Sequence, residues 1–249
     1  MCILMVLHQG IPGYPIVVAA NRDEYYERPT EGPHQLVSDA PVWGGKDSRA
    51  GGTWLGLNAH GLVIGLTNRR MRADQENDPQ RRSRGLLCLE ALQCHSADEA
   101  AAFVGREPPG RYNPFNLLMM DPQSMLWAAY DDTPQVQRLQ PGLHILANGD
   151  LNDIETVRIR RAQRLLSATA QTELAVCLPL LEQVCRDHES GVQDRETMCM
   201  HRDHERYGTV SSTILAVTPG LRGSIYRYAA GHPCTTPYED YSLLLTPQP

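Results

Sequence analysis

The start of the chain constrains the fold more than any other segment. Residues 1–9 are dominated by Ile, Leu, Met and Val, and residues 14–20 form a second apolar, β-prone run. The Gly-Ile-Pro-Gly segment between them is a turn, so we expect a β-hairpin. Both strands are almost continuously apolar, which predicts that both faces of the hairpin are covered. The polar tetrapeptide Asn-Arg-Asp-Glu follows at residues 21–24 and is therefore expected nearly opposite residue 2.

Strand hairpins and pairs of amphipathic helices follow in turn, which favours an α+β layer sandwich over repeated βαβ units. A capping box formed by Ser96 and Glu99 predicts the start of one helix. Residues 27–50 and 69–83 are expected to form long loops, and residues 1–249 to form a single domain. The expected strands are 53–57, 61–68, 115–121, 125–131, 143–148, 209–217 and 223–230, and the expected helices are 84–94, 96–104, 154–168 and 173–188.

Composition excludes several classes of function. The 249 residues are 41% hydrophobic and 21% charged, with a formal net charge of -6. A nucleic-acid groove requires a basic excess, so no nucleic-acid partner is expected. The apolar runs are too short for a membrane span, and we find no secretory signal. Seven cysteines at irregular spacings, with no CxxC pair, indicate a reducing compartment, and we expect a cytoplasmic protein. The sequence does not determine the oligomeric state.

Cys2 has the chemistry of a nucleophile. A free Cys is only slightly ionised at neutral pH and needs a base. Removal of Met1 would provide one, because the α-amine of Cys2 would then be tethered to the thiol. The reference pKa of that amine, about 7.7–8.0, lies close to the working pH of a general base. The alternative interpretation is a buried, inert Cys that happens to follow Met.

The tetrapeptide at residues 21–24 carries suitable partners for this thiol. A carboxylate there could orient the α-amine, and a guanidinium could lower the thiol pKa or bind a substrate carboxylate. Alternatively, these polar residues simply leave the strand for solvent. Asn68 and Asn148 end strand-like segments, where a fixed side-chain amide can stabilise an oxyanion, although such asparagines are usually turn formers.

Taken together, these motifs resemble the NRDE family, also known through the transport and Golgi organisation protein 2 homologues. The resemblance extends over most of the chain and depends on the order of its motifs. The matching segments are Met1-Cys2-Ile3-Leu4, residues 18–24 with Arg28-Pro29, Gly51-Gly52-Thr53-Trp54-Leu55-Gly56, Leu66-Thr67-Asn68, Asn113-Pro114-Phe115-Asn116-Leu117, Tyr207-Gly208-Thr209 and Ser211-Ser212-Thr213.

This resemblance implies an N-terminal-nucleophile (Ntn) hydrolase fold: a four-layer αββα sandwich with two stacked antiparallel sheets. It implies that Cys2 attacks the amide (C–N, non-peptide) or related acyl bond of a small acylated substrate without a cofactor. It also implies that Asp23 contacts the α-amine and that Asn148 holds the oxyanion. The residues expected to bind substrate are Asn21, Arg22, Trp54 and Asn68.

Two positions lack an expected arginine, one relative to the related acylases and one relative to the NRDE family. Ala20 stands where those acylases carry Arg, and Val210 stands where family members often carry Arg. Arg22 is the neighbouring candidate to replace the missing group.

The family resemblance also permits a non-enzymatic role as a carrier or chaperone for haem or lipid. A cluster of Cys and His near the end of the chain could ligate haem iron or another metal. Its spacing is not one of the standard zinc patterns, and charged neighbours favour a solvated loop, so no metal site is assigned. The residues concerned are Cys199, His201, His204, His232 and Cys234.

Overall fold

A computed structural model describes residues 2–70, 77–167, 173–189 and 196–246, and the chain divides into two compact units. Unit 1 comprises residues 1–28 and 141–249, and unit 2 comprises residues 29–140. Each unit contains one antiparallel sheet and two α-helices. The assignment of the whole chain to a single domain stays a prediction.

The sheet of unit 1 contains the predicted N-terminal hairpin. Its strand order is β10-β1-β2-β12-β13-β14, with β11 also pairing with β12. The first strand therefore has neighbours on both sides. The strands are β1 (Cys2–Ile11), β2 (Tyr14–Tyr25), β10 (Gly142–Leu146), β11 (His201–Arg202), β12 (Tyr207–Val217), β13 (Ile225–Ala229) and β14 (Glu239–Asp240).

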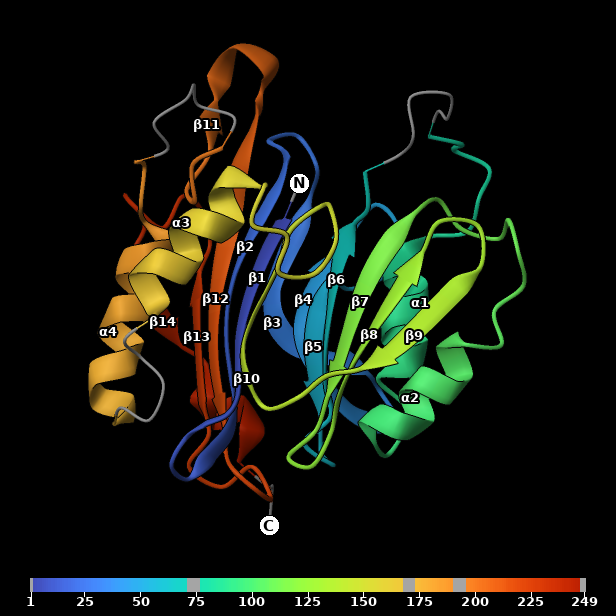
Figure 1. Ribbon diagram of the computed structural model, residues 1–249, viewed down its shortest axis with the longest axis horizontal. Coiled ribbons are helices and arrows are strands. Elements are labelled where there is room, and N and C mark those ends of the chain that lie inside the picture. The colour runs from blue at the N-terminus through green and yellow to red at the C-terminus, as the bar shows by residue number, and fades with distance from the viewer. Residues whose placement is uncertain (1, 71–76, 168–172, 190–195, 247–249) are drawn as a thin grey trace. The chain divides into compact units, whose positions relative to one another are not determined.

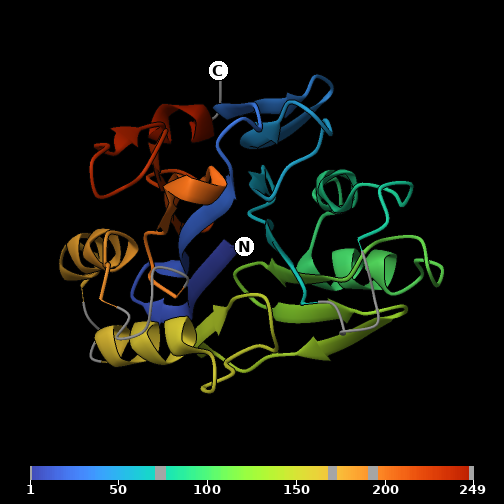
Figure 2. The ribbon, with the colours of Figure 1, turned by 90° about the horizontal axis from the view of Figure 1, so that it is seen from above.

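Helices α3 (Val157–Leu166) and α4 (Leu174–Cys185) lie on one face of this sheet (Figures 1 and 2). Their apolar residues form one core cluster with alternate residues of the sheet, such as Ile3 and Met5 of β1. The intervening residues Leu4 and Val6 are buried as well. Both faces of the hairpin are thus buried, which confirms the prediction from its continuous apolar runs.

Unit 2 has the strand order β3-β4-β5-β6-β7-β8-β9. Helices α1 (Arg84–Ala91) and α2 (Ala97–Val104) pack their apolar residues against one face of it (Figures 1 and 2). Ser96 caps α2 by accepting a hydrogen bond from the Glu99 backbone N–H at 3.2 Å, as the capping box predicts. The strands are β3 (Thr30–Val37), β4 (Ala40–Asp47), β5 (Leu55–Asn58), β6 (Val63–Asn68), β7 (Phe115–Met120), β8 (Met125–Tyr130) and β9 (Pro134–Arg138).

The expectation of a long irregular loop at residues 27–50 is wrong, because β3 and β4 form a hairpin there. Pro33 is tolerated because β3 is the edge strand and its pairing shifts register around this residue. Proline in a sheet is confined to such edges and bulges, so it obscured the strand pattern. Of the predicted loop at 69–83, residues 71–76 lie outside the described residues; Arg69 is paired with Asp131, 2.8 Å apart.

Two short 3₁₀ helices complete the described secondary structure, at Asp203–Glu205 and Ser242–Leu245. Among the described residues, no helix is long and apolar enough to span a membrane.

Candidate active site

Cys2 begins β1 and lies directly opposite Arg22 of β2, which in turn pairs with Ser211 of β12. Residues directly opposite each other in antiparallel strands project from the same face of the sheet. Ile3 and Met5 belong to the core against α3 and α4, so alternation directs Cys2 to the other face, together with Arg22. Arg22, the arginine nearest in sequence to Ala20, is therefore on the same sheet face as the Cys2 thiol.

Asn148 follows the end of β10 on the other side of Cys2. Leu146 of β10 pairs with Leu4 of β1, and Asn148 follows it by two residues, past the end of the strand. Asn148 is buried, with 8% of its surface exposed. Strand pairing thus places Arg22 opposite Cys2, and Asn148 follows the strand that flanks β1 on its other side.

Asp23 lies at the same end of the sheet, but its carboxylate projects toward the helices. Arg158 of α3 donates a hydrogen bond from Nη1 to Oδ2 of Asp23 at 2.8 Å. Thr209 of β12, its strand partner, donates from Oγ1 to Oδ1 at 2.6 Å. The Asp23 and Arg158 side chains are 0% and 4% exposed, so this is a buried ion pair. Buried charges of this kind persist in proteins when they are paired and hydrogen-bonded.

Asn21 also projects toward the helices. Its Nδ2 donates to the backbone carbonyls of Cys185 and Met198, at 2.9 and 2.8 Å. These bonds join β2 to the end of α4 and to the chain segment before β11. Both amide hydrogens are thereby used within unit 1, and the predicted substrate-binding role of Asn21 stays a prediction.

The surroundings of Cys2 act on its thiol in opposite directions. Burial raises the pKa of the Cys2 thiol above its ordinary value, and the Asp23 carboxylate raises it further. A hydrogen bond from the Asp23 backbone N–H and the positive charge of Arg22 both lower the pKa of this thiol. A thiol in this setting needs a base beside it to become a nucleophile.

The other two predicted site residues belong to unit 2. Trp54 is almost buried at 9% exposure, and a Cβ added at Gly45 would lie 2.5 Å from its ring, so the indole lies against the β4 backbone. Asn68 ends β6 and is exposed. Their substrate-binding roles stay predictions.

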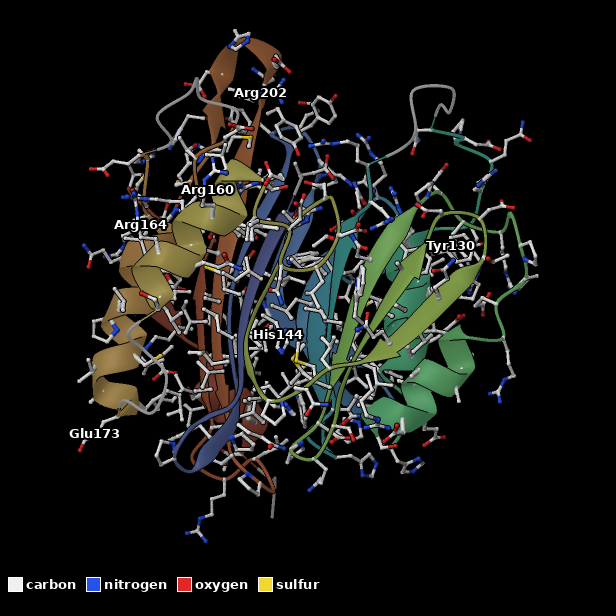
Figure 3. The ribbon with its side chains drawn as sticks, in the orientation of Figure 1. Tyr130, His144, Arg160, Arg164, Glu173 and Arg202 are labelled. Carbon is white, nitrogen blue, oxygen red and sulfur yellow. The ribbon has the colours of Figure 1, made fainter. Side chains whose placement is uncertain are left out.

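Sequence reasoning missed Arg158. The residue lies in an arginine-rich helix in which Arg160 and Arg164 are exposed (Figure 3) and Arg161 is partly buried, 2.7 Å from Asp187. Its signal is helical spacing, because Arg158 shares a four-residue interval with Ala162 and Leu166, both buried. A charged residue on the apolar stripe of a helix predicts a buried partner, although it does not identify Asp23.

Several solved structures of similar fold are acylases or amidases. An N-acylethanolamine-hydrolyzing acid amidase ortholog from Caenorhabditis elegans is 15% identical, with a TM-score of 0.61 over 89% of this chain and 94% of that one. Penicillin V acylase from Agrobacterium tumefaciens is 12% identical, with a TM-score of 0.60 over 92% and 83%. A mutant conjugated bile acid hydrolase from Clostridium perfringens is 10% identical, with a TM-score of 0.60 over 100% and 95%. The fold is therefore of the Ntn-hydrolase type, which confirms the predicted α+β fold class.

Within this class, the family model "Transport and Golgi organisation 2" matches residues 1–226. The chain belongs to this family, which confirms the resemblance seen in its motifs. The mouse homologue is 31% identical over 129 residues, 49% of this chain and 45% of that protein. The human homologue is 32% identical over 132 residues, again 49% and 45%. The chain thus spans less than half the length of these relatives.

Proposed function

We propose that this protein is an N-terminal cysteine hydrolase that cleaves the amide or related acyl bond of a small acylated substrate. The observation that carries the proposal is the pairing of Cys2 with Arg22 at the start of β1, and Asn148 just past the end of the adjacent strand β10 supports it. Acyl transfer to a cysteine uses an activated thiol and a donor for the oxyanion, and a nearby positive charge favours the thiolate. The fold shared with acylases and an acid amidase supports the same reaction class.

In this mechanism, removal of Met1, which lies outside the described residues, frees the α-amine of Cys2. The amine accepts the thiol proton, and the thiolate attacks the acyl carbon. The tetrahedral oxyanion is held by the Asn148 side-chain amide. The C–N bond then breaks, the leaving amine takes the proton, and a thioester remains on Cys2. Water attacks the thioester, which releases the carboxylic acid and restores the thiol.

The charged neighbours have separate tasks in the proposal. Arg22 stabilises the thiolate because it lies directly opposite Cys2 and lowers the pKa of its thiol. Asp23 orients the α-amine, and Arg158 and Thr209 hold Asp23 in place.

The decisive experiment tests whether hydrolysis requires the free α-amine of Cys2 in addition to its thiol. The protein is produced with a removable N-terminal fusion that a protease releases directly before Cys2. We expect hydrolysis of N-acyl amines, and acylation of Cys2 by an electrophilic acyl probe, to appear only after cleavage. Intact mass before and after cleavage verifies the new terminus. Equal hydrolysis by the fused and the cleaved protein would overturn the mechanism.

Two variants serve as matched controls. Cys2→Ala removes the nucleophile and should abolish both hydrolysis and probe labelling. Cys94→Ala removes another partly exposed cysteine, from unit 2, and should leave both unchanged. Full activity of Cys2→Ala would assign the reaction to another residue.

The alternative function, a haem or lipid carrier, predicts the opposite result for the Cys2→Ala variant. A carrier needs neither a free terminus nor the Cys2 thiol, so its ligand binding would survive Cys2→Ala. Haem titration monitored by absorption, on the wild-type protein and this variant, distinguishes the two functions.

A further inference from the structure

A group of soft metal-ligand side chains gathers in unit 1, apart from the paired Cys2 and Arg22. One donor atom from each of His188, Cys199, His201 and Cys234 lies within 4.8 Å of every other. His188 follows α4, Cys199 and His201 lie at the start of β11, and Cys234 lies in the turn after β13. Folding thus brings together three chain segments that the sequence separates.

Three of the six donor separations are close to the edges of a tetrahedron around zinc, and all six are within 4.8 Å. The two sulfur atoms are 3.7 Å apart, and His201 Nε2 lies 3.5 Å from Cys199 Sγ and 3.3 Å from Cys234 Sγ. Zinc–sulfur and zinc–nitrogen bonds of about 2.3 and 2.0–2.1 Å require edges of about 3.8 Å between sulfurs and about 3.6 Å between sulfur and nitrogen. The sulfur separation is far longer than a disulfide bond, about 2.05 Å.

Further contacts hold the ligands in this arrangement. The His232 ring lies against the His201 ring, with centroids 4.1 Å apart. The Cys199 backbone N–H donates to the Asp187 carbonyl at 3.0 Å, which ties the segment to the residue before His188. Cys199 is buried and His188 is exposed, so the group opens to solvent on one side. A metal ion can therefore enter where the fourth ligand lies.

We propose that His188, Cys199, His201 and Cys234 form a structural zinc site. Two thiolates and two imidazoles make a ligand set that selects zinc over hard cations such as magnesium, and four protein ligands leave no open position for catalysis. The set differs from the one suggested by the sequence: His188 joins it, and His204 and His232 are outside it. His204 is largely exposed and lies 3.3 Å from Glu205.

The zinc site would also fasten the backbone that supports Asp23. The Met198 carbonyl, next to Cys199, accepts hydrogen bonds from Arg158 at 3.1 Å and from Asn21 at 2.8 Å. Met200, on the other side of Cys199, donates its backbone N–H to Thr209 Oγ1 at 2.8 Å. A metal bound by Cys199 would therefore fix residues 198–200, to which Arg158, Asn21 and Thr209 are hydrogen-bonded. The proposal does not depend on whether Cys2 is catalytic.

The test uses the full-length protein and measures metal directly. We expect one zinc per chain by elemental mass spectrometry, and cobalt(II) added to chelator-treated protein should give the thiolate charge-transfer bands of a tetrahedral site. Zinc, but not magnesium, should raise the melting temperature of the treated protein by several degrees. Failure of the wild-type protein to bind either zinc or cobalt stoichiometrically would overturn the proposal.

Variants locate the site. Cys199→Ser and Cys234→Ser should lose stoichiometric zinc, and His188→Ala should weaken zinc binding without unfolding the chain, because His188 is exposed. His204→Ala and Cys94→Ser are matched controls from outside the group and should bind zinc as the wild type does. Unchanged zinc affinity in His188→Ala together with either serine variant would also overturn the assignment.

Discussion

Arg158 and Asp23 are 135 residues apart in sequence and form a buried ion pair, with Nη1 of Arg158 2.8 Å from Oδ2 of Asp23. The pair joins α3 to the end of β2, beside the residue that faces Cys2. Because both side chains are buried, their mutual attraction offsets the cost of removing each charge from water.

Arg158→Met tests this attraction. Leaving the Asp23 carboxylate buried without its guanidinium should lower the free energy of unfolding by about 3–5 kcal/mol in urea denaturation. Arg160→Met, at an exposed position of the same helix, should cost less than about 1 kcal/mol. Adding Asp23→Asn to Arg158→Met should cost less than the sum of the single changes. Strict additivity would show that the two side chains are not coupled.

Thr209→Val tests the second partner of Asp23. The hydroxyl donates to Asp23 at 2.6 Å and accepts from the Met200 backbone N–H at 2.8 Å. Removing it at constant shape leaves two buried polar groups without this partner, at a cost of about 1–3 kcal/mol of unfolding free energy. Thr209→Ser retains the hydroxyl and should be the more stable variant. The reverse order of stability would contradict this account.

Asn58→Ala tests a buried side chain that makes four hydrogen bonds to the backbone of unit 2. The Asn58 side chain donates to the carbonyls of Leu92 and Cys94 at 2.8 and 2.7 Å, and it accepts from the backbone N–H groups of His60 and Leu62 at 2.9 and 3.1 Å. Removing four bonds to backbone groups should cost at least about 3 kcal/mol, measured by urea denaturation. Asn58→Asp keeps the acceptor but directs a carboxylate at two carbonyls, so it should also destabilise. A loss below about 1 kcal/mol for both would refute this role.

Gly52→Ala tests the contact between the Gly-Gly-Thr-Trp-Leu-Gly motif and α1. A Cβ at Gly52 would lie 2.2 Å from the carbonyl carbon of Gly85, so one backbone segment must move. We expect a loss of about 1–3 kcal/mol in unfolding free energy. Gly10→Ala provides the comparison, because its Cβ would meet Leu7 at an ordinary 3.6 Å. Equal stability of the two variants would show that the close approach is not a constraint.

Stability should fall at alkaline pH. Burial raises the pKa of the Cys177 and Cys185 thiols to about 11 in each case. Because the folded-state pKa is higher than that of an unfolded cysteine, about 8.5, this contribution is complete below pH 8.5 and is lost as the pH rises to 11. Urea denaturation at pH 8 and pH 10.5 should show the decrease. Cys185→Ala, although less stable at neutral pH, should show a shallower decrease; unchanged wild-type stability between these pH values would contradict the prediction.

The sequence predicted the elements whose patterns are local. The N-terminal hairpin, the four helices and the Ser96 cap follow from apolar periodicity and capping chemistry. The β3–β4 hairpin was missed because Pro33 and neighbouring glycines imitate a loop, whereas edge position and bulging make them compatible with a strand.

Part of the candidate site could also be predicted, because strand pairing is a local consequence of the hairpin. Counting residues from its turn placed the tetrapeptide opposite Cys2, and the register confirms Arg22 there. The partners of Asp23 and the His188 ligand could not be found in this way. They come from α3 and from the end of α4, and the packing of a helix on a sheet leaves no fixed interval in the sequence.

The position of β1 between β2 and β10 determines the order in which strands can pair while the chain is synthesised. Unit 2 is continuous in sequence, so all its strand partners have left the ribosome soon after residue 140. The opening hairpin, by contrast, waits for β10, which follows unit 2 in the sequence, and then for β12, which lies nearer the C-terminus. Its two apolar strands thus lack their outer partners through most of translation, and exposed apolar strands make nascent chains prone to aggregate.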